Sequence, residues 1–143
     1  MSLSWIDEHR EEYLADGENG HYWDSTVVGG PGLIPCILLF TTGRKSGKTS
    51  IMPLIYGEVE GGYAIVASKG GAPAHPDWYF NLQANPEVQV KLGNEQFAAD
   101  SQTLEGTKRE AAWQTMVGIW PFYEDYQKKT EREIPVVLLT RKA

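Results

Sequence analysis

A chain of 143 residues has the length of one domain, and 41% hydrophobic with 22% charged residues is an ordinary globular composition. The net charge of -6 at pH 7 argues against a nucleic acid partner. No apolar run approaches the ~20 residues of a membrane span, and the N-terminus lacks the basic start and apolar block of a signal peptide. We therefore expect a single domain that spans residues 1–143. Because the single Cys36 cannot form an internal disulfide, we also expect the protein to lie in the cytoplasm.

The N-terminal part is predicted to be one helix followed by irregular chain. The helix is expected within residues 1–16, where Trp5, His9 and Tyr13 fall near one face. It could pack on the domain, extend over a partner or touch a membrane surface, and its acidic polar face makes membrane contact the weakest option. Residues 17–35 are rich in glycine and are predicted to be an irregular lead-in.

The rest of the chain alternates between strand-like and helix-like segments. A capping box at Thr107–Glu110 is predicted to open one of the helices. Short turns connect most strands, which implies antiparallel pairing. The sequence therefore predicts an α+β, mainly β fold: a small antiparallel barrel or curled sheet with flanking helices. The predicted strands are 36–42, 49–56, 63–68, 88–92, 96–103 and 134–140, and the predicted helices are 76–85, 107–119 and 121–129.

A basic stretch at 42–49, Thr-Gly-Arg-Lys-Ser-Gly-Lys-Thr, stands between two apolar runs. It ends like a Walker A motif, but Thr42 stands where that motif needs a glycine, and the segment that follows is β-like rather than helical. Cations this close together repel one another unless an anion neutralises them. The stretch is either a solvated hairpin turn or a site for an anion other than a nucleoside triphosphate.

Two further stretches combine turns or helices with aromatic side chains. Segment 67–71, Ala-Ser-Lys-Gly-Gly, leads towards a helix that begins near Asp77, and backbone N–H groups at such a place can bind phosphate or a ring carbonyl. The alternative is a plain strand-to-helix connection. Trp120, Tyr123 and Tyr126 are three residues apart and share a helix face, as core packing or as the wall of a pocket for a flat substrate.

Metal and hydrolase chemistry are not indicated. The three histidines lie in different segments and there is one cysteine, so no metal site is expected. No G-x-S-x-G nucleophile elbow is present.

These stretches, in this order, resemble the deazaflavin-dependent nitroreductase and quinone reductase family of actinobacteria, which uses coenzyme F420. The resemblance implies a split β-barrel related to FMN-binding oxidoreductases. It also implies hydride transfer from reduced F420 to a quinone, a nitroaromatic or another electron-poor unsaturated compound as the small-molecule partner. It covers about residues 38–140 and is carried by 41–47, 53–54, 67–71, 76–82, 84–86, 123–126 and 134–136.

The resemblance also implies the site residues. F420 has a phosphodiester and a polyglutamate tail, and Arg44, Lys45 and Ser46 match positions that hold this anionic part. Ser68, Tyr123 and Tyr126 are the candidates for polarising an acceptor oxygen or supplying a proton. The other implied cofactor contacts are Ser50, Ile51, Met52, Pro53, Leu54, Ile55, Val66, Ala67, Lys69, Asp77, Trp78, Tyr79, Phe80 and Asn81, in addition to Ser68 and Tyr123.

Three positions depart from the family pattern. Ser50 stands where the best-known nitroreductase has an arginine, although Lys48 is close to it in sequence. Ile55 and Trp120, which with Tyr126 are expected in the substrate pocket, replace tyrosines. These departures leave the cofactor expectation in place and argue against nitroimidazole activation.

Alternatives to this reading stay open. One is an FMN-dependent oxidoreductase with the same barrel. FMN has a single phosphate, however, which gives the four cations little to bind; these are Arg44, Lys45, Lys48 and Lys69. The others are a non-catalytic binder of F420 or of a lipid-like ligand, and a plain interaction module. Both a monomer and a homodimer are compatible with the sequence.

Overall fold

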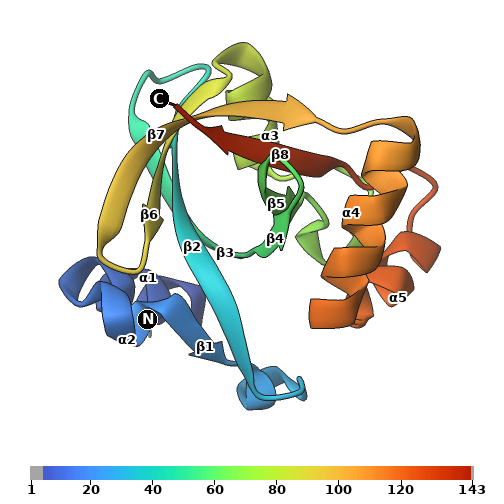
Figure 1. Ribbon diagram of the computed structural model, residues 1–143, viewed down its shortest axis with the longest axis horizontal. Helices are drawn as coiled ribbons and strands as arrows, with labels where there is room; N and C mark the ends of the chain where they lie inside the picture. The colour runs from blue at the N-terminus through green and yellow to red at the C-terminus, as the bar shows by residue number, and fades with distance from the viewer. Residues whose placement is uncertain (1–4, 143) are drawn as a thin grey trace.

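The computed structural model describes residues 5–142, and within them the chain forms a curled antiparallel sheet with helices at its margins (Figure 1). The strand order is β1-β2-β6-β7-β8-β5-β4, and β3 pairs with β2. All pairings are antiparallel, which confirms the predicted fold class. The strands are β1 (Tyr22–Asp24), β2 (Leu33–Thr42), β3 (Thr49–Ile55), β4 (Gly57–Val59), β5 (Gly62–Val66), β6 (Glu87–Leu92), β7 (Glu95–Thr103) and β8 (Val136–Arg141).

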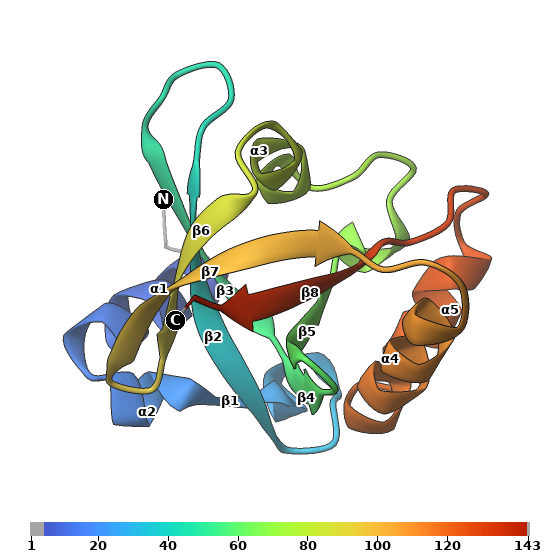
Figure 2. The same cartoon turned by 45° about the horizontal axis from the view of Figure 1, so that its top comes forward.

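The helices lie in three groups around the sheet. In Figure 1, α1 and α2 lie near the β6–β7 turn, whereas α4 and α5 stand at the opposite side. Figure 2 shows α3 above the sheet, beside the projecting turn between β2 and β3. The helices are α1 (Trp5–Ala15), α2 (Gly17–His21), α3 (Asp77–Ala84), α4 (Gly106–Ile119) and α5 (Phe122–Lys128), and short 3-10 turns span Ser25–Val28 and Lys69–Gly71.

The sheet buries hydrophobic side chains on both faces. Strand side chains alternate between faces, and in β5 the two sets enter different clusters. Ile65 packs with α3 and the sheet interior, whereas Ala64 and Val66 pack with α4 and α5. Leu38 of β2 is fully buried against Tyr13 of α1. Strands covered on both faces need continuous apolar runs, which is why their sequences show so little alternation.

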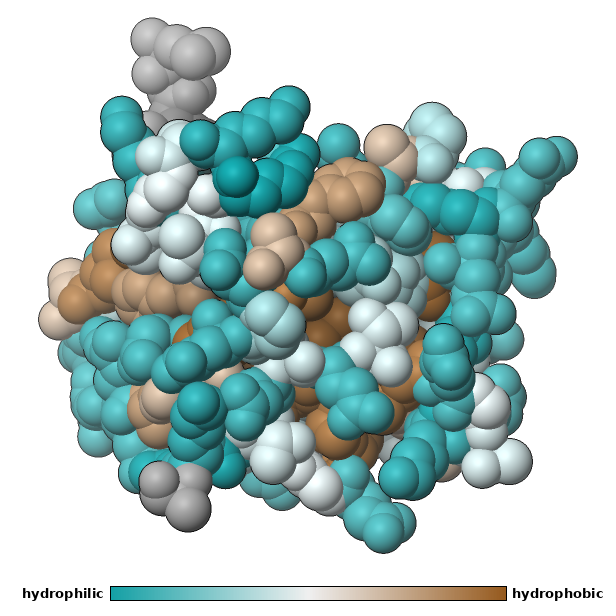
Figure 3. Space-filling model, turned by 90° about the horizontal axis from the view of Figure 1, so that it is seen from above, coloured by the Kyte–Doolittle hydropathy of each residue, from teal (hydrophilic) through white to brown (hydrophobic). Residues whose placement is uncertain are grey.

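Helix α1 packs on the sheet, the first of the three roles that its sequence allows. The hydroxyl of the fully buried Tyr13 donates to the carbonyl of Cys36 at 2.9 Å and accepts from the N–H of Gly93 at 2.7 Å. These bonds attach the helix to β2 and to the β6–β7 turn. Among the described residues, none of the helices is long and apolar enough to cross a membrane. Hydrophilic side chains cover most of the face seen from above, with hydrophobic surface between them (Figure 3).

Two predictions about the elements were wrong, and one short strand was missed. The lead-in at 17–35 is not irregular throughout, because α2, β1, a 3-10 turn and the start of β2 lie within it. Asp16 accepts from the N–H of Glu18 at 3.0 Å, and this cap starts α2. The predicted capping box does not form either: α4 begins at Gly106, after Glu105, with no side-chain cap. Strand β4 was not predicted, because three residues are too short to show a period.

Candidate functional site

A cavity of about 410 Å³ opens between β3, the end of β5 and α5. This size lies within the usual range of small-molecule pockets, and its lining is mostly apolar and aromatic. We call it the aromatic cavity. Eleven of the predicted site residues line it: Met52, Pro53, Leu54, Ile55, Val66, Ser68, Lys69, Trp78, Trp120, Tyr123 and Tyr126.

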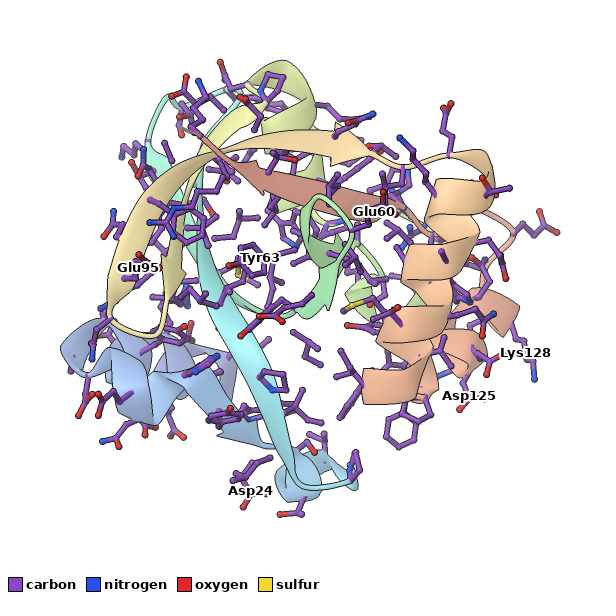
Figure 4. The ribbon with its side chains drawn as sticks, in the orientation of Figure 1. Asp24, Glu60, Tyr63, Glu95, Asp125 and Lys128 are labelled. Carbon is purple, nitrogen blue, oxygen red and sulfur yellow. The ribbon has the colours of Figure 1, made fainter. Side chains whose placement is uncertain are left out.

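Three aromatic side chains around α5 form one wall of the aromatic cavity. The rings of Tyr123 and Tyr126 meet edge to face with centroids 6.1 Å apart, and the indole N–H of Trp120 donates to the Tyr126 hydroxyl at 3.4 Å. Trp120 and Tyr123 are buried, whereas Asp125 and Lys128 lie at the outer edge of α5 (Figure 4). The three-residue spacing on α5 places the Tyr123 and Tyr126 rings together. The prediction that Trp120 shares their helix face was wrong, because Trp120 lies before α5, at the non-helical C-cap of α4. All three side chains line the cavity.

The protonation states of Tyr123 and Cys36, which line the aromatic cavity, follow from their burial. Burial raises the pKa of the Tyr123 hydroxyl well above its usual value, and neighbouring Cys36 and Tyr126 raise this pKa further. Burial likewise raises the pKa of the Cys36 thiol to about 12. At neutral pH the Tyr123 hydroxyl is therefore a hydrogen-bond donor rather than a base, and Cys36 is an unreactive thiol.

The basic turn between β2 and β3 forms a second, more open hollow. The two strands pair up to Thr42 and Thr49, and the turn between them is closed by the Gly43 N–H, which donates to the Lys48 carbonyl at 2.7 Å. Its predicted hairpin form is confirmed. We call this hollow the basic groove. It is lined by Gly43, Arg44, Lys45, Ser46, Lys48, Thr49, Ser50, Asp77 and Asn81.

The polar residues of the basic groove differ in their contacts. Arg44 is attached to α3: its guanidinium donates to the side-chain oxygen of Asn81 at 3.0 Å and lies 3.5 Å from an oxygen of Asp77. The Ser46 hydroxyl accepts from the N–H of Lys48 at 3.1 Å and so braces the turn. Lys45 and Lys48 are exposed. Arg44 therefore positions the turn as much as it contributes charge.

The two hollows adjoin along two elements. On β3, Ser50 borders the basic groove and Met52 borders the aromatic cavity. Two strand residues span ~7 Å. At the start of α3, Asp77 faces the groove, and its neighbours Pro76 and Trp78 line the cavity. A ligand with a flat apolar end and an anionic end can occupy both hollows at once.

Four predicted cofactor contacts line neither hollow. Ala67 and Tyr79 are buried in the core, and the Tyr79 hydroxyl is 2.9 Å from that of Thr103. Ile51 packs against the Tyr13 cluster, and Phe80 lies under the Arg44 guanidinium, 5.0 Å from ring centroid to Cζ. Lys69 lines the aromatic cavity and is not part of the basic groove.

Several cavity residues were not predicted from the sequence. Trp23 carried a signal, as a large aromatic residue in a glycine-rich stretch; its ring lies 5.8 Å from that of Trp120. Gly70 and Pro76 lie in stretches 67–71 and 76–82, which the sequence already singled out. The rest have no local pattern, because the fold brings them in from separate elements. The unpredicted lining residues are Ile6, His9, Trp23, Val28, Cys36, Gly70 and Pro76. Across the part of the chain that the structure describes, no group of three His, Cys, Asp or Glu side chains is placed to hold a metal ion.

Comparison with known proteins identifies the family. The family model described as F420H(2)-dependent quinone reductase matches residues 15–141. The chain belongs to this family. An F420H(2)-dependent quinone reductase of Mycobacterium tuberculosis is 40% identical over 115 residues, which are 78% of this chain and 77% of that protein. The prediction of an F420-dependent oxidoreductase is thus confirmed, and F420 rather than FMN is the cofactor of the family.

Solved structures agree with this assignment. The structure of an F420-H2 dependent reductase is 48% identical, covers 73% of this chain and 93% of its own, and superposes with a TM-score of 0.68. A chain described as a domain-swapped dimer is 42% identical, covers 94% of this chain and 96% of its own, and gives a TM-score of 0.71.

The two hollows also fit the F420 molecule on physical grounds. A deazaflavin ring is flat and largely apolar, which suits the aromatic cavity, and a polyglutamate tail is anionic, which suits the exposed cations Lys45 and Lys48. The exposed Asp77 carboxylate opposes an anion there, but its charge is offset by Arg44 at 3.5 Å.

Proposed function

We propose that this protein oxidises reduced F420 with a quinone as electron acceptor. The observation that supports it most directly is the continuity between the apolar aromatic cavity and the basic groove along β3 and the start of α3. A cavity alone would suit many flat ligands, and a basic turn alone would suit many anions. Together they suit one ligand that has both parts.

The basic groove is proposed to hold the anionic tail. Lys45 and Lys48 supply the charge, while Arg44 fixes the turn against α3 and adds to the positive potential. Because the groove is open to solvent, its attraction is long-ranged but screened by salt. The groove therefore contributes affinity and orientation and takes no part in the chemistry.

The aromatic cavity is proposed to hold the reacting ring against the acceptor. F420 in its reduced form supplies two electrons as a hydride. The protein holds the two reactants in contact and excludes water, which supplies much of the rate. Met52, Leu54 and Ile55 offer the apolar surface on one side, and the aromatic side chains around α5 offer it on the other.

Hydroxyl groups in the aromatic cavity are proposed to stabilise the acceptor. The protonated Tyr123 hydroxyl can donate to an oxygen on which negative charge develops, and the half-buried Ser68 hydroxyl can do the same. Tyr126 accepts from Trp120, which leaves its own proton available for donation. A proton for the reduced acceptor then comes from one of these hydroxyls or from solvent.

The test is a spectral assay of reduced F420 oxidation. Purified protein is mixed with reduced F420 and one acceptor from a panel of quinones, nitroaromatics and unsaturated lactones. We expect turnover with quinones, and less with nitroimidazoles because Ile55 and Trp120 replace tyrosines. Titration with FMN is the control, and we expect no saturable binding. Binding of F420 without turnover on any acceptor would favour a non-catalytic F420 binder instead.

Cellular setting and assembly belong to the same proposal. The buried, free thiol of Cys36 suits a reducing compartment, and we place the activity in the cytoplasm. Since a related chain is described as a domain-swapped dimer, both a monomer and a homodimer are to be tested by sedimentation.

A further inference from the structure

One wall of the aromatic cavity has an unusual backbone. Lys69, Gly70 and Gly71 follow one another with φ values of 47°, 64° and 84°. Within residues 5–142, Lys69 is the one residue other than glycine with a positive φ, a conformation that costs an L-residue free energy. Ser68 and Lys69 both line the cavity. Glycines adopt such values readily, so the shape of this wall depends on Lys69 holding a conformation that its own backbone does not favour.

Arg132 lies behind this turn and makes four contacts with it. Its Nη2 donates to the Ser68 carbonyl at 2.7 Å and its Nε to the Ala72 carbonyl at 2.9 Å. Its Nη1 lies 3.2 Å from the Ala67 carbonyl and 2.9 Å from Nδ1 of His75. All four acceptors lie within 67–75, so one guanidinium joins both ends of the turn.

The contact between Arg132 and His75 determines the protonation state of the imidazole ring. A guanidinium can only donate, so Nδ1 of His75 must accept and the ring is neutral, with its proton on Nε2. Burial and the positive charge of Arg132 both lower the pKa of His75. Arg132 thus selects one tautomer of His75.

Arg132 is itself held in place by α5. The side-chain amide of Gln127 donates to the Arg132 carbonyl at 2.7 Å and accepts from the N–H of Ile134 at 2.9 Å. Among the described residues, none of the carboxylates pairs with Arg132 within 4.0 Å. Its donors are therefore directed to the turn, and the Gln127 contacts connect it to the helix that carries Tyr123 and Tyr126.

We propose that Arg132 is a positioning residue that holds segment 67–75 in its left-handed turn and thereby places Ser68 and Lys69 in the cofactor cavity. Arg132 does not itself line that cavity. The expected effect on F420 affinity rests on the function proposed above, whereas the effect on the turn does not. A guanidinium is needed because its planar fork reaches several carbonyls at once; a lysine ammonium is a single point on a flexible stem.

The test compares Arg132→Lys and Arg132→Ala with Arg141→Lys. Arg141 is the control, because its guanidinium also makes several hydrogen bonds, to the Glu95 carboxylate at 3.0 and 2.7 Å, but away from the cavity. The first readout is hydrogen exchange of the Gly71 and Ala72 amides, which donate to the Ser68 and Lys69 carbonyls, in protein without cofactor. The second is the affinity for oxidised F420, measured by fluorescence titration. The third is the nitrogen NMR spectrum of His75.

We expect both Arg132 variants to raise exchange at Gly71 and Ala72 at least tenfold, while amides between β5 and β8 change less than twofold. F420 affinity should fall at least tenfold, and His75 should lose its single tautomer. Millimolar methylguanidinium should restore protection in Arg132→Ala; if that variant does not fold, Arg132→Lys decides alone. Arg141→Lys should change none of these readouts.

Unchanged exchange and affinity in Arg132→Lys would overturn the proposal, and so would an equal effect of Arg141→Lys or no recovery with methylguanidinium. If the unaltered protein does not bind F420, the proposed function fails. The exchange and NMR measurements still decide the role of Arg132 in that case, since they need no cofactor.

Discussion

At the scale of single residues, the three cations of the basic groove differ in how free they are. Arg44 lies over the Phe80 ring and bonds to Asn81, which is buried and donates to the Thr41 hydroxyl at 3.2 Å. Lys45 and Lys48 are exposed. Removing Arg44 should therefore disturb the turn as well as its charge, whereas removing the lysines changes charge alone.

The lysines can be tested by the response of F420 binding to tail length and salt. In Lys45→Ala/Lys48→Ala we expect affinity for F420 with a long glutamate tail to fall by about 1 kcal/mol, or roughly fivefold. The dependence of affinity on salt should also weaken, because two fewer cations meet the tail. The measurement is fluorescence titration at several ionic strengths, with short-tailed F420 as comparison.

The control for this charge effect is Lys128→Ala. Lys128 lies at the outer edge of α5, away from both hollows (Figure 4). It changes the net charge in the same direction without altering the groove. If tail length and salt affected the double variant as strongly as the unaltered protein, the electrostatic role of the groove would be refuted.

At the scale of elements, long strands could be predicted and short elements could not. β2 and β3 were predicted to within three residues because their apolar runs are long and a Gly-rich basic turn separates them. α2 and β1 were missed, since five and three residues are too few for a period to show. The resemblance predicted Ser68 and Tyr123 as site residues, and both line the aromatic cavity. Nothing local marked Arg132, whose proposed role arises from contacts across 57 to 65 residues of sequence.

The turn at 69–71 is an element that is sensitive to substitution. A Cβ on Gly71 would lie 2.7 Å from the Tyr126 carbonyl oxygen, and φ there is +84°. We therefore expect Gly71→Ala to lower the free energy of unfolding by about 2–3 kcal/mol, from the left-handed backbone and the close contact together. Urea unfolding followed by tryptophan fluorescence measures this change.

Gly70→Ala is the matched control for that substitution. Gly70 also has a positive φ, 64°, but a Cβ there meets no atom within 4 Å. Its cost should be about 1 kcal/mol, that of the backbone conformation alone. Equal costs at the two positions would mean that the close approach between the turn and α5 is not tight in solution.

At the scale of the whole molecule, the sheet holds two helical groups apart, and the aromatic cavity lies between them. Ile6 and His9 of α1 face it from one side, and Tyr123 and Tyr126 of α5 from the other. The same arrangement buries several titratable groups away from water. Stability should therefore depend on pH through groups spread over the molecule, not through one site.

On the acid side, histidines are the first groups to contribute as the pH falls from neutral. Burial lowers the pKa of His21 and His75 below the ordinary 6.5, and Arg132 adds to this for His75. The unfolded chain then binds more protons than the folded one below pH 6.5. Their contribution to stability is complete above pH 6.5 and is lost as the pH falls through their lowered pKa values.

On the alkaline side, the buried thiol and phenol groups lower the stability of the fold as the pH rises. Burial raises the pKa of Cys36 from 9.0 to about 12, and those of Tyr13 and Tyr56 from 10.0 to about 12. The folded protein keeps protons that the unfolded chain loses above pH 9, so stability falls as the pH rises further. We expect urea midpoints to be highest between pH 6.5 and 9, with an unchanged m-value. In Cys36→Ala the alkaline decline should begin near pH 10, where only the tyrosines remain; a decline that still begins at pH 9 would show that the thiol of Cys36 is not the group responsible.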